Sequence, residues 1–201
     1  MSNITLGIIG GGQLGSMLAI AAKKLGIKII IFCDDSEAPA QNFCDEFIGA
    51  KYDDKEKINE FVNKVDIVTY EFENIPYETL NDINKLKPVL PKPSVNRLIQ
   101  HRLAEKDFVN KLNIRTTRYV SVENQSDIDV LEDFLPGIIK TTTLGYDGKG
   151  QHPISSSEEL KNLKLDLSRG YILEKLVKLK KEISIIITCL LYTSPSPRDL
   201  S

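Results

Sequence analysis

The sequence predicts an α/β protein in two parts, the first built on a mostly parallel sheet and the second on antiparallel strands. Over residues 6–69, apolar runs typical of buried strands alternate with segments of helical periodicity, which implies βαβ crossovers and parallel strands. Three prolines interrupt residues 86–93 and separate the two parts. Beyond residue 118, two strands are joined through a glycine-rich loop, the pattern of an antiparallel hairpin.

In the first part, a strand at Leu6–Ile9 stops at three glycines, and a helix follows up to Gly26. The apolar residues of this helix recur at helical spacing: Leu14, Met17, Leu18, Ala21, Ala22 and Leu25. The continuous β-branched run Ile27–Phe32 predicts a parallel strand that is buried on both faces. The remaining elements expected here are a short strand at Phe47-Ile48, an amphipathic helix at Lys55–Lys64 and a strand at Val65–Thr69.

The second part begins after the prolines, where Ser94 is expected to cap a helical segment that runs to Leu112 in two pieces around Gln100-His101. Downstream, strands are expected at 119–122, 138–142, 151–154, 171–177 and 182–188, and helices at 126–134 and 157–163. The expected organisation is therefore a domain over 1–93, a second, incomplete domain over 94–188, and a tail over 189–201. The serines and prolines of the tail cannot extend a sheet.

Composition excludes several classes of protein. The chain has 201 residues, 41% of them hydrophobic, and a net charge of -2, so it lacks the basic field that drives binding to nucleic acid. No apolar run reaches the roughly 18 residues of a membrane span. The three cysteines have neither disulfide-framework nor zinc-site spacing. We therefore expect a cytoplasmic protein, neither exported nor embedded in a membrane, without a metal site built from these cysteines.

The first candidate site is the glycine turn near the amino terminus. Gly10, Gly12 and Gly15 satisfy the G-x-G-x-x-G pattern between a strand and a helix, and Asp34 or Asp35 lies at the end of the next strand. By template this is a dinucleotide-binding fingerprint for NAD(P) or FAD. The same glycines would serve another ligand at that strand end, or a purely structural turn. Gln13 either reaches such a ligand or faces solvent.

The second candidate site is the glycine-rich loop within residues 141–151, between two strands. Its freed backbone amides and Lys149 suit phosphate oxygens, although a flexible hairpin tip has the same composition. Lys140 ends an apolar strand just upstream, so it is placed either to meet the phosphates or to protect an edge strand from aggregation. Glu174 and Glu182, in the next strands, either accept hydrogen bonds from a ligand or pair with neighbouring lysines in solvent.

This series of residues resembles the ATP-grasp superfamily: a lysine at a strand end, a glycine-rich hairpin, an E-x-x-V strand and a further glutamate. More narrowly, the segments at 10–17 (GGGQLGSM), 70–74 (YEFEN) and 145–151 (GYDGKGQ), in this order, resemble the N5-carboxyaminoimidazole ribonucleotide synthase family of purine biosynthesis. The resemblance covers residues 4 to about 188. It implies a Rossmann-like pre-ATP-grasp domain that does not bind NAD, followed by an incomplete ATP-grasp α+β domain.

The resemblance also implies roles for individual residues. Arg102 and Lys140 would contact the phosphates of ATP, and Glu182 would hold its ribose hydroxyls. The loop that closes over the phosphates would be Gly145, Tyr146, Asp147, Gly148, Lys149, Gly150 and Gln151. The adenine would lie against Glu174, Lys175, Leu176 and Val177, chiefly through backbone groups. The acceptor substrate would lie at Gly12, Gln13, Leu14 and Glu73, and Asp34 would lose its ribose role.

The implied reaction activates bicarbonate with ATP to give carboxyphosphate, whose CO2 unit passes to the exocyclic amine of 5-aminoimidazole ribonucleotide. It requires charge neutralisation by lysines and magnesium and closure against water. No side-chain nucleophile is required, so no catalytic residue is nominated. The groups that could suggest one are expected to be caps or surface residues: Ser94, Ser121, His101 and His152. Family members are commonly homodimers, which is the expectation for a full-length form.

The chain departs from the family pattern near Cys189, because members continue well beyond this length. The part beyond would carry the magnesium ligands and the rest of the sheet, so the chain as given is expected to be inactive and its second part prone to aggregation. Within the superfamily, the alternative is a formate-dependent glycinamide ribonucleotide transformylase. From other classes, the alternatives are an NAD(P)-binding oxidoreductase and a fragment without catalysis.

Overall fold

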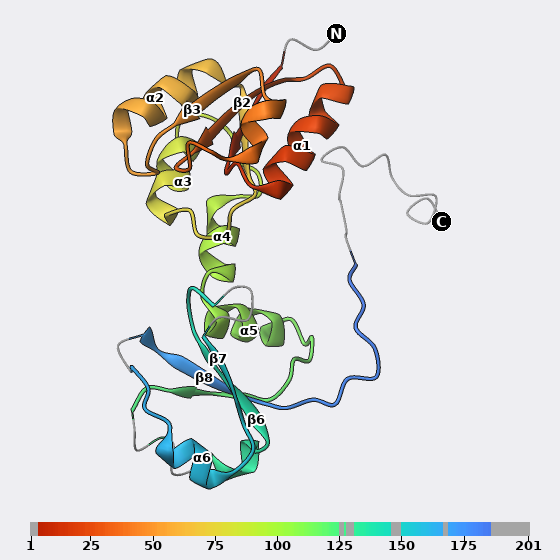
Figure 1. Cartoon of the computed structure of the whole chain (residues 1–201), viewed down its shortest axis with the longest axis vertical. Coiled ribbons are helices and arrows are strands. Elements are labelled where there is room, and N and C mark those ends of the chain that lie inside the picture. Colours follow the sequence, from red (N-terminus) through yellow and green to blue (C-terminus); the bar gives the residue numbers. More distant parts are fainter. Residues whose placement is uncertain (1–3, 125–126, 128–130, 146–149, 167–168, 186–201) are drawn as a thin grey trace.

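The computed structural model describes residues 4–124, 127, 131–145, 150–166 and 169–185, which form two four-stranded sheets with helices between them (Figure 1). All strand pairs of the first sheet are parallel, whereas those of the second are antiparallel. The α/β class and the change of strand direction between the two parts are therefore confirmed.

The first sheet has the strand order β3-β2-β1-β4. Its strands are β1 Thr5–Ile9, β2 Lys28–Cys33, β3 Glu46–Gly49 and β4 Ile67–Tyr70. β2 is an interior strand that is buried from Ile29 to Cys33, which explains its unbroken apolar run. Because the strands are parallel, the loops that follow β1, β2 and β4 meet at one edge of this sheet, where the glycine turn lies.

Helices cover both faces of the first sheet: α1 Gln13–Lys24, the 3-10 helix η1 Pro39–Phe43, α2 Lys55–Lys64 and α3 Tyr77–Asn84. One apolar cluster joins one face to α2 and α3 through Phe61 and Leu80. Another joins the opposite face to α1 and η1 through Ala19 and Ala40. The sequence prediction missed η1 and α3, which are short elements held in place by these clusters.

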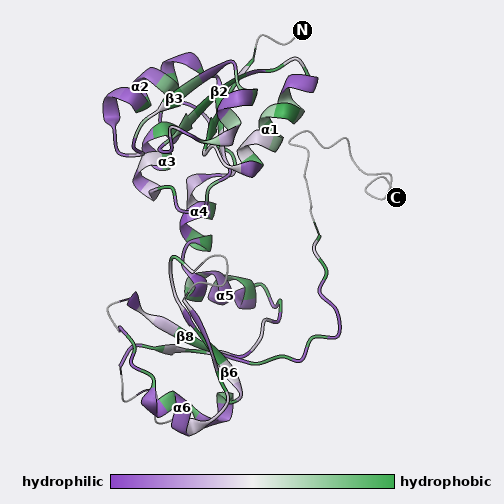
Figure 2. Ribbon diagram, viewed as in Figure 1, coloured by the Kyte–Doolittle hydropathy of each residue, from purple (hydrophilic) through white to green (hydrophobic). Residues whose placement is uncertain are grey.

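Helix α1 packs on the sheet through small residues. Gly15, Ser16, Ala19 and Ala22 are its buried residues. The larger apolar side chains lie on the other side of the helix, where Leu14 is 57% and Met17 58% exposed. Figure 2 colours the ribbon of α1 by hydropathy, with apolar residues in green. A Cβ on Gly15 would lie 2.8 Å from the carbonyl oxygen of Gly10, so only glycine permits this close approach. The apolar spacing thus predicts the helix but not the face that it buries.

Two helices, α4 Pro93–Ile99 and α5 Arg102–Lys111, connect the sheets (Figure 1). The predicted break around Gln100-His101 is confirmed. The prediction that Ser94 caps the helix is wrong: the N-cap is Lys92, two residues earlier, and α4 begins at Pro93, because proline suits the first helical position. His101 caps α5, since its Nδ1 accepts a hydrogen bond from the Ala104 N–H at 3.3 Å.

The second sheet has the strand order β5-β8-β6-β7. Its strands are β5 Tyr119–Val122, β6 Gly137–Thr141, β7 Gln151–Ile154 and β8 Tyr171–Lys175, and α6 Ser157–Asn162 lies between β7 and β8 in the chain. β6 pairs with β7 as the predicted hairpin, and with β8 on its other side. The register places Gln151 opposite Lys140 and Glu174 opposite Ile138.

Three sequence predictions for the second part differ from the structure. β8 ends at Lys175 rather than at residue 177. Residues 182–185 form no strand, and Ile183 and Ile185 are 82% and 72% exposed. Within the described part of the predicted helix 126–134, the structure has the 3-10 turn η3 Glu132–Phe134. An apolar run becomes a strand only when a neighbouring strand takes its hydrogen bonds, and residues 182–185 pair with no described strand.

None of the helices in the described part of the chain has the length and apolar character that a bilayer span requires. The predicted tail over 189–201 lies outside the described residues. The division into 1–93 and 94–188 stays a prediction.

Candidate functional site

The glycine turn joins β1 to α1 and has a left-handed backbone. Gly10 has a φ of 102°, which a side chain would strain. The third glycine of the pattern, Gly15, provides the close contact between helix and strand described above. The turn is therefore built as a tight bend, and two of its glycines have structural reasons that need no ligand.

A carboxylate occupies the place where a dinucleotide would put its phosphates. The Gly12 N–H donates to Glu71 Oε1 at 2.9 Å, at the amino end of α1. That position is where a Rossmann fold binds pyrophosphate through the helix dipole and free amides. With Glu71 in this position, a phosphate would be repelled by the carboxylate and would find the Gly12 N–H already hydrogen-bonded. The dinucleotide interpretation of the fingerprint is therefore disfavoured, in agreement with the resemblance.

A cavity of about 250 Å³ lies beside this turn, lined among others by Gly12, Cys33, Asp34 and Glu71. Its walls carry carboxylates and no lysine or arginine, so a ligand with hydrogen-bond donors suits it better than an anion. Gln13 and Leu14 are exposed at the start of α1. Glu71 was not among the residues nominated from the sequence, although it belongs to the YEFEN segment.

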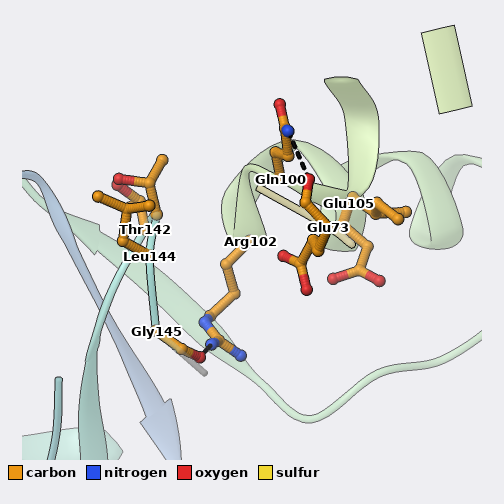
Figure 3. Close-up of a pocket in the computed structure, with 9 residues that line it drawn as sticks. Glu73, Gln100, Arg102, Glu105, Thr142, Leu144 and Gly145 are labelled. Carbon is orange, nitrogen blue, oxygen red and sulfur yellow. Dashed lines mark hydrogen bonds between the residues drawn. The ribbon is translucent and has the colours of Figure 1, made fainter. Parts of the chain in front are cut away.

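Glu73 lies in a different cavity, of about 350 Å³, between the α4–α5 junction and the loop that follows β6 (Figure 3). Its lining residues are Glu73, Ile99, Gln100, Arg102, Glu105, Thr142, Thr143, Leu144 and Gly145. The Gln100 amide holds the segment after β4 in place, because its Nε2 donates to the carbonyl oxygens of Glu73 at 2.6 Å and Ile75 at 2.7 Å. The structure thus separates Glu73 from Gly12, which lines the first cavity.

Arg102 ties the start of α5 to the beginning of the glycine loop. Its backbone N–H donates to the carbonyl oxygen of Thr142 at 2.8 Å. Its guanidinium donates from Nε to the Thr141 carbonyl at 3.3 Å and from Nη2 to the Gly145 carbonyl at 2.9 Å, as Figure 3 shows for Gly145. Carbonyl oxygens do not cancel the charge of the guanidinium, but Glu73 and Glu105 line the same cavity and bring negative charge to it.

Lys140 and Glu174 form an ion pair on adjacent strands, with Lys140 Nζ 2.7 Å from Glu174 Oε2. Lys106 of α5 approaches the other carboxylate oxygen at 3.0 Å. The interpretation of Lys140 as an edge-strand charge is wrong, because β6 lies between β8 and β7. The interpretation of Glu174 as a solvated strand residue is also wrong: it does pair with lysines, but it is only 6% exposed.

The lysines set the protonation of this carboxylate. Burial raises the pKa of Glu174, but hydrogen bonds from Lys140 and Lys106, together with their positive charges, outweigh the burial. The pKa of Glu174 therefore lies below its ordinary value, and the group is ionised at neutral pH. Sequence reasoning missed Lys106. The available signal was its position four residues after Arg102, which puts both cations on one face of a helix.

The other nominated residues lie around this cluster or apart from it. Gly150 has a φ of 67°, and Gln151 of β7 lies opposite Lys140 of β6 in the strand register. Lys175 Nζ donates to the Asp133 carbonyl at 2.9 Å. Leu176, Val177 and Glu182 are exposed beyond the end of β8. Tyr146, Asp147, Gly148 and Lys149 lie outside the described residues.

The arrangement can bind an anion. Lys106 and Lys140 share the carboxylate of Glu174, which leaves one net positive charge suited to a phosphate group. Arg102 binds carbonyl oxygens at the start of the glycine loop, in a cavity that Glu73 and Glu105 also line. Within the described ranges, no three His, Cys, Asp or Glu side chains lie together in a way that would hold a metal ion.

Comparison with protein families assigns both parts of the chain. Residues 3–100 match the model of the ribonucleotide synthetase preATP-grasp domain, and residues 107–190 match that of the ATP-grasp domain. Among individual proteins, the N5-carboxyaminoimidazole ribonucleotide synthase of Staphylococcus aureus is 37% identical over 187 residues, which are 92% of this chain and 50% of that protein. The chain thus spans about half the length of the curated relatives it matches.

Solved structures agree. The ADP complex of an N5-carboxyaminoimidazole ribonucleotide synthetase is similar with a TM-score of 0.82 and 36% identity, over 90% of this chain and 48% of that one. The N5-carboxyaminoimidazole synthetase of Staphylococcus aureus, also complexed with ADP, is similar with a TM-score of 0.78 and 34% identity, over 88% of this chain and 48% of that one. The two-part fold with a partial ATP-grasp domain is therefore confirmed.

Proposed function

Since the chain belongs to the N5-carboxyaminoimidazole ribonucleotide synthase family, we propose that its second part binds ATP for the carboxylation of 5-aminoimidazole ribonucleotide. The observation that carries this proposal is the position of Lys140 near the end of β6, with the Arg102 guanidinium bound to the Thr141 and Gly145 carbonyl oxygens of the segment that follows. Two of the solved structures that resemble the chain are complexes with ADP. The proposed activity is that of proteins as long as the relatives, and this chain spans about half of their length.

In the proposed reaction, bicarbonate attacks the terminal phosphorus of ATP, the bond to the bridging oxygen breaks, and carboxyphosphate and ADP form. The exocyclic amine of 5-aminoimidazole ribonucleotide then takes the CO2 unit, and phosphate leaves. Arg102 and Lys140 neutralise the charge on the phosphates, and the glycine loop shields the short-lived intermediate from water. The described residues provide no ligand set for magnesium, so we assign no step to this metal.

The remaining roles follow the family pattern as proposals. The strand end at Glu174 to Val177 would carry the adenine, Glu182 the ribose, and Gly12, Gln13, Leu14 and Glu73 the acceptor substrate. The separation of Glu73 from Gly12 into two cavities means that the acceptor would have to reach across the edge of the first sheet. A homodimeric full-length form and a cytoplasmic location also stay predictions.

Replacement of Lys140 by methionine is expected to weaken ATP binding about 30-fold, because one charged hydrogen bond to phosphate is lost. The remaining Glu174–Lys106 pair is neutral, so the variant should still fold. Isothermal titration calorimetry with ATP measures the effect. Lys161→Met, at an exposed lysine of α6, is the matched control and should bind ATP like the unaltered chain.

Titration with NADH separates this function from the oxidoreductase alternative. No saturable binding of NADH is expected, because Glu71 occupies the phosphate position at α1. Saturable binding of NADH without binding of ATP would reject the proposal in favour of a dinucleotide enzyme. ATP affinity that is equal in Lys140→Met and Lys161→Met would show that the lysine cluster is not the nucleotide site.

A chain extended to the length of its relatives is expected to release phosphate from ATP in the presence of bicarbonate, and 5-aminoimidazole ribonucleotide should stimulate that release. The physical reason is that the acceptor amine consumes carboxyphosphate and so draws the reaction forward. A phosphate-release assay with glycinamide ribonucleotide and formate is the comparison. Stimulation by that pair alone would identify the transformylase alternative instead.

A further inference from the structure

The carboxylate of Glu174 is shared between two lysines from different elements. Its Oε2 lies 2.7 Å from Lys140 Nζ on the neighbouring strand β6, and its Oε1 lies 3.0 Å from Lys106 Nζ on helix α5. The side chains are only 8%, 16% and 14% exposed for Glu174, Lys140 and Lys106. Water therefore screens these charges little, and their sum matters for any ligand beside them.

The charges of this trio do not cancel. Lys140 and Glu174 alone would form a neutral pair, which offers little attraction to a phosphate. With Lys106 on the second carboxylate oxygen, two ammonium groups share one carboxylate and the trio carries one net positive charge. Lys106 thus provides the charge that Glu174 would otherwise remove from Lys140.

The surroundings hold Lys106 in this position. Its Nζ lies 5.3 Å from the centre of the Tyr119 ring, a cation–π contact, and the register of β5 with β8 places Tyr119 opposite Glu174. The Tyr119 hydroxyl in turn donates to Asp107, the residue next to Lys106 on α5. The lysine is therefore fixed between the helix and the sheet by contacts on both sides.

We infer that Lys106 is a positioning residue of the proposed ATP site: by engaging one oxygen of Glu174, it leaves Lys140 with uncompensated charge for a phosphate of the nucleotide. The inference rests on the proposed function. It assigns to the Glu174 side chain the holding of two lysines. It distinguishes Lys106, which acts through Glu174, from Lys140, which meets the phosphate.

The test is calorimetric titration of the 201-residue chain with ATP and with adenosine, which lacks phosphates. Lys106→Met is expected to raise the Kd for ATP about tenfold and to leave the Kd for adenosine unchanged. It leaves a neutral Lys140–Glu174 pair and no unpaired buried charge, so it should fold. Lys106→Arg keeps the charge and should bind ATP within about twofold of the unaltered chain. Lys111→Met, at an exposed lysine on the same helix, is the matched control.

The double variant Lys106→Met with Glu174→Gln provides the decisive result. It removes one positive and one negative charge, so Lys140 regains its net charge, and ATP affinity should recover most of the loss. A purely structural role for Lys106 predicts no recovery and an equal loss for adenosine, and either result would overturn the inference. Equal ATP affinity in Lys106→Met and Lys111→Met would overturn it while leaving the proposed function intact. Absence of ATP binding by the unaltered chain would overturn both.

Discussion

Replacing Glu174 by alanine is expected to destabilise the second sheet by about 3 kcal/mol. The change leaves the ammonium groups of Lys106 and Lys140, which are 14% and 16% exposed, without their shared carboxylate. Buried charges that lose their partner are among the few single changes with so large an effect. Urea unfolding, followed by amide hydrogen exchange in β6 and β8, measures this sheet separately from the first.

The control for this prediction is Glu182→Ala, because Glu182 is exposed and its removal should change stability by less than about 0.5 kcal/mol. The dependence on pH provides a second check. The pKa of Glu174 lies below its ordinary 4.5, so its contribution is fully present above that pH and is lost as the pH falls through the lower, folded-state value. Acid unfolding of the second sheet should therefore include a component that Glu174→Gln lacks. Equal stability of the two alanine variants would contradict the buried ion trio.

Replacing Phe61 by alanine is expected to destabilise the first sheet by about 4 kcal/mol. Phe61 of α2 is fully buried, and its ring lies 5.5 Å from that of Phe32 on β2. A Cβ on Gly7 would lie only 2.5 Å from the Phe61 ring, so the ring rests directly on the backbone of β1. Truncation would leave a cavity between α2 and the sheet. Urea unfolding measures the loss of stability, and hydrogen exchange in β1 and β2 assigns it to this sheet.

The matched control is Phe43→Ala, since Phe43 in η1 is 38% exposed and should contribute less than about 1 kcal/mol. Because the two sheets have separate apolar clusters, Phe61→Ala should leave exchange in β6 and β8 unchanged. Loss of protection in both sheets to the same degree would show that they unfold as one unit. An effect no larger than that of Phe43→Ala would contradict the packing described for Phe61.

The strands and long helices could be predicted because their patterns are local. The buried run of β2 and the glycine turn before α1 are written in consecutive residues. The short helix α3 was missed although Tyr77, Leu80 and Ile83 recur at helical spacing, because eight residues give too few repeats of the pattern to establish a helix. The prediction of a strand from residue 182 was wrong for residues 182–185 for a different reason. Their apolar pattern is present, but they have no partner strand among the described residues, and a strand does not form alone.

The candidate site shows the same division. Lys140 and the glycine loop were identified from the sequence pattern, and Arg102 from the family resemblance; their nucleotide roles stay predictions. Glu71 and Lys106 were not identified, because their meaning depends on contacts across 59 and 68 positions of the chain, to Gly12 and Glu174. In the sequence, Glu71 is an acidic residue after a strand and Lys106 is a lysine on a helix, and both residue types are usually found on the surface.

By itself, the amino-acid order predicted most of the strands and the longer helices, the presence of two parts, and which glycines and lysines are candidates for a phosphate site. Only the tertiary structure decided which charges meet: that Glu71 closes the dinucleotide position, and that Glu174 is shared by two lysines. The physical reason is range. Backbone conformation responds to neighbours within a few residues, whereas the net charge of a site is set by side chains that packing brings together from distant segments.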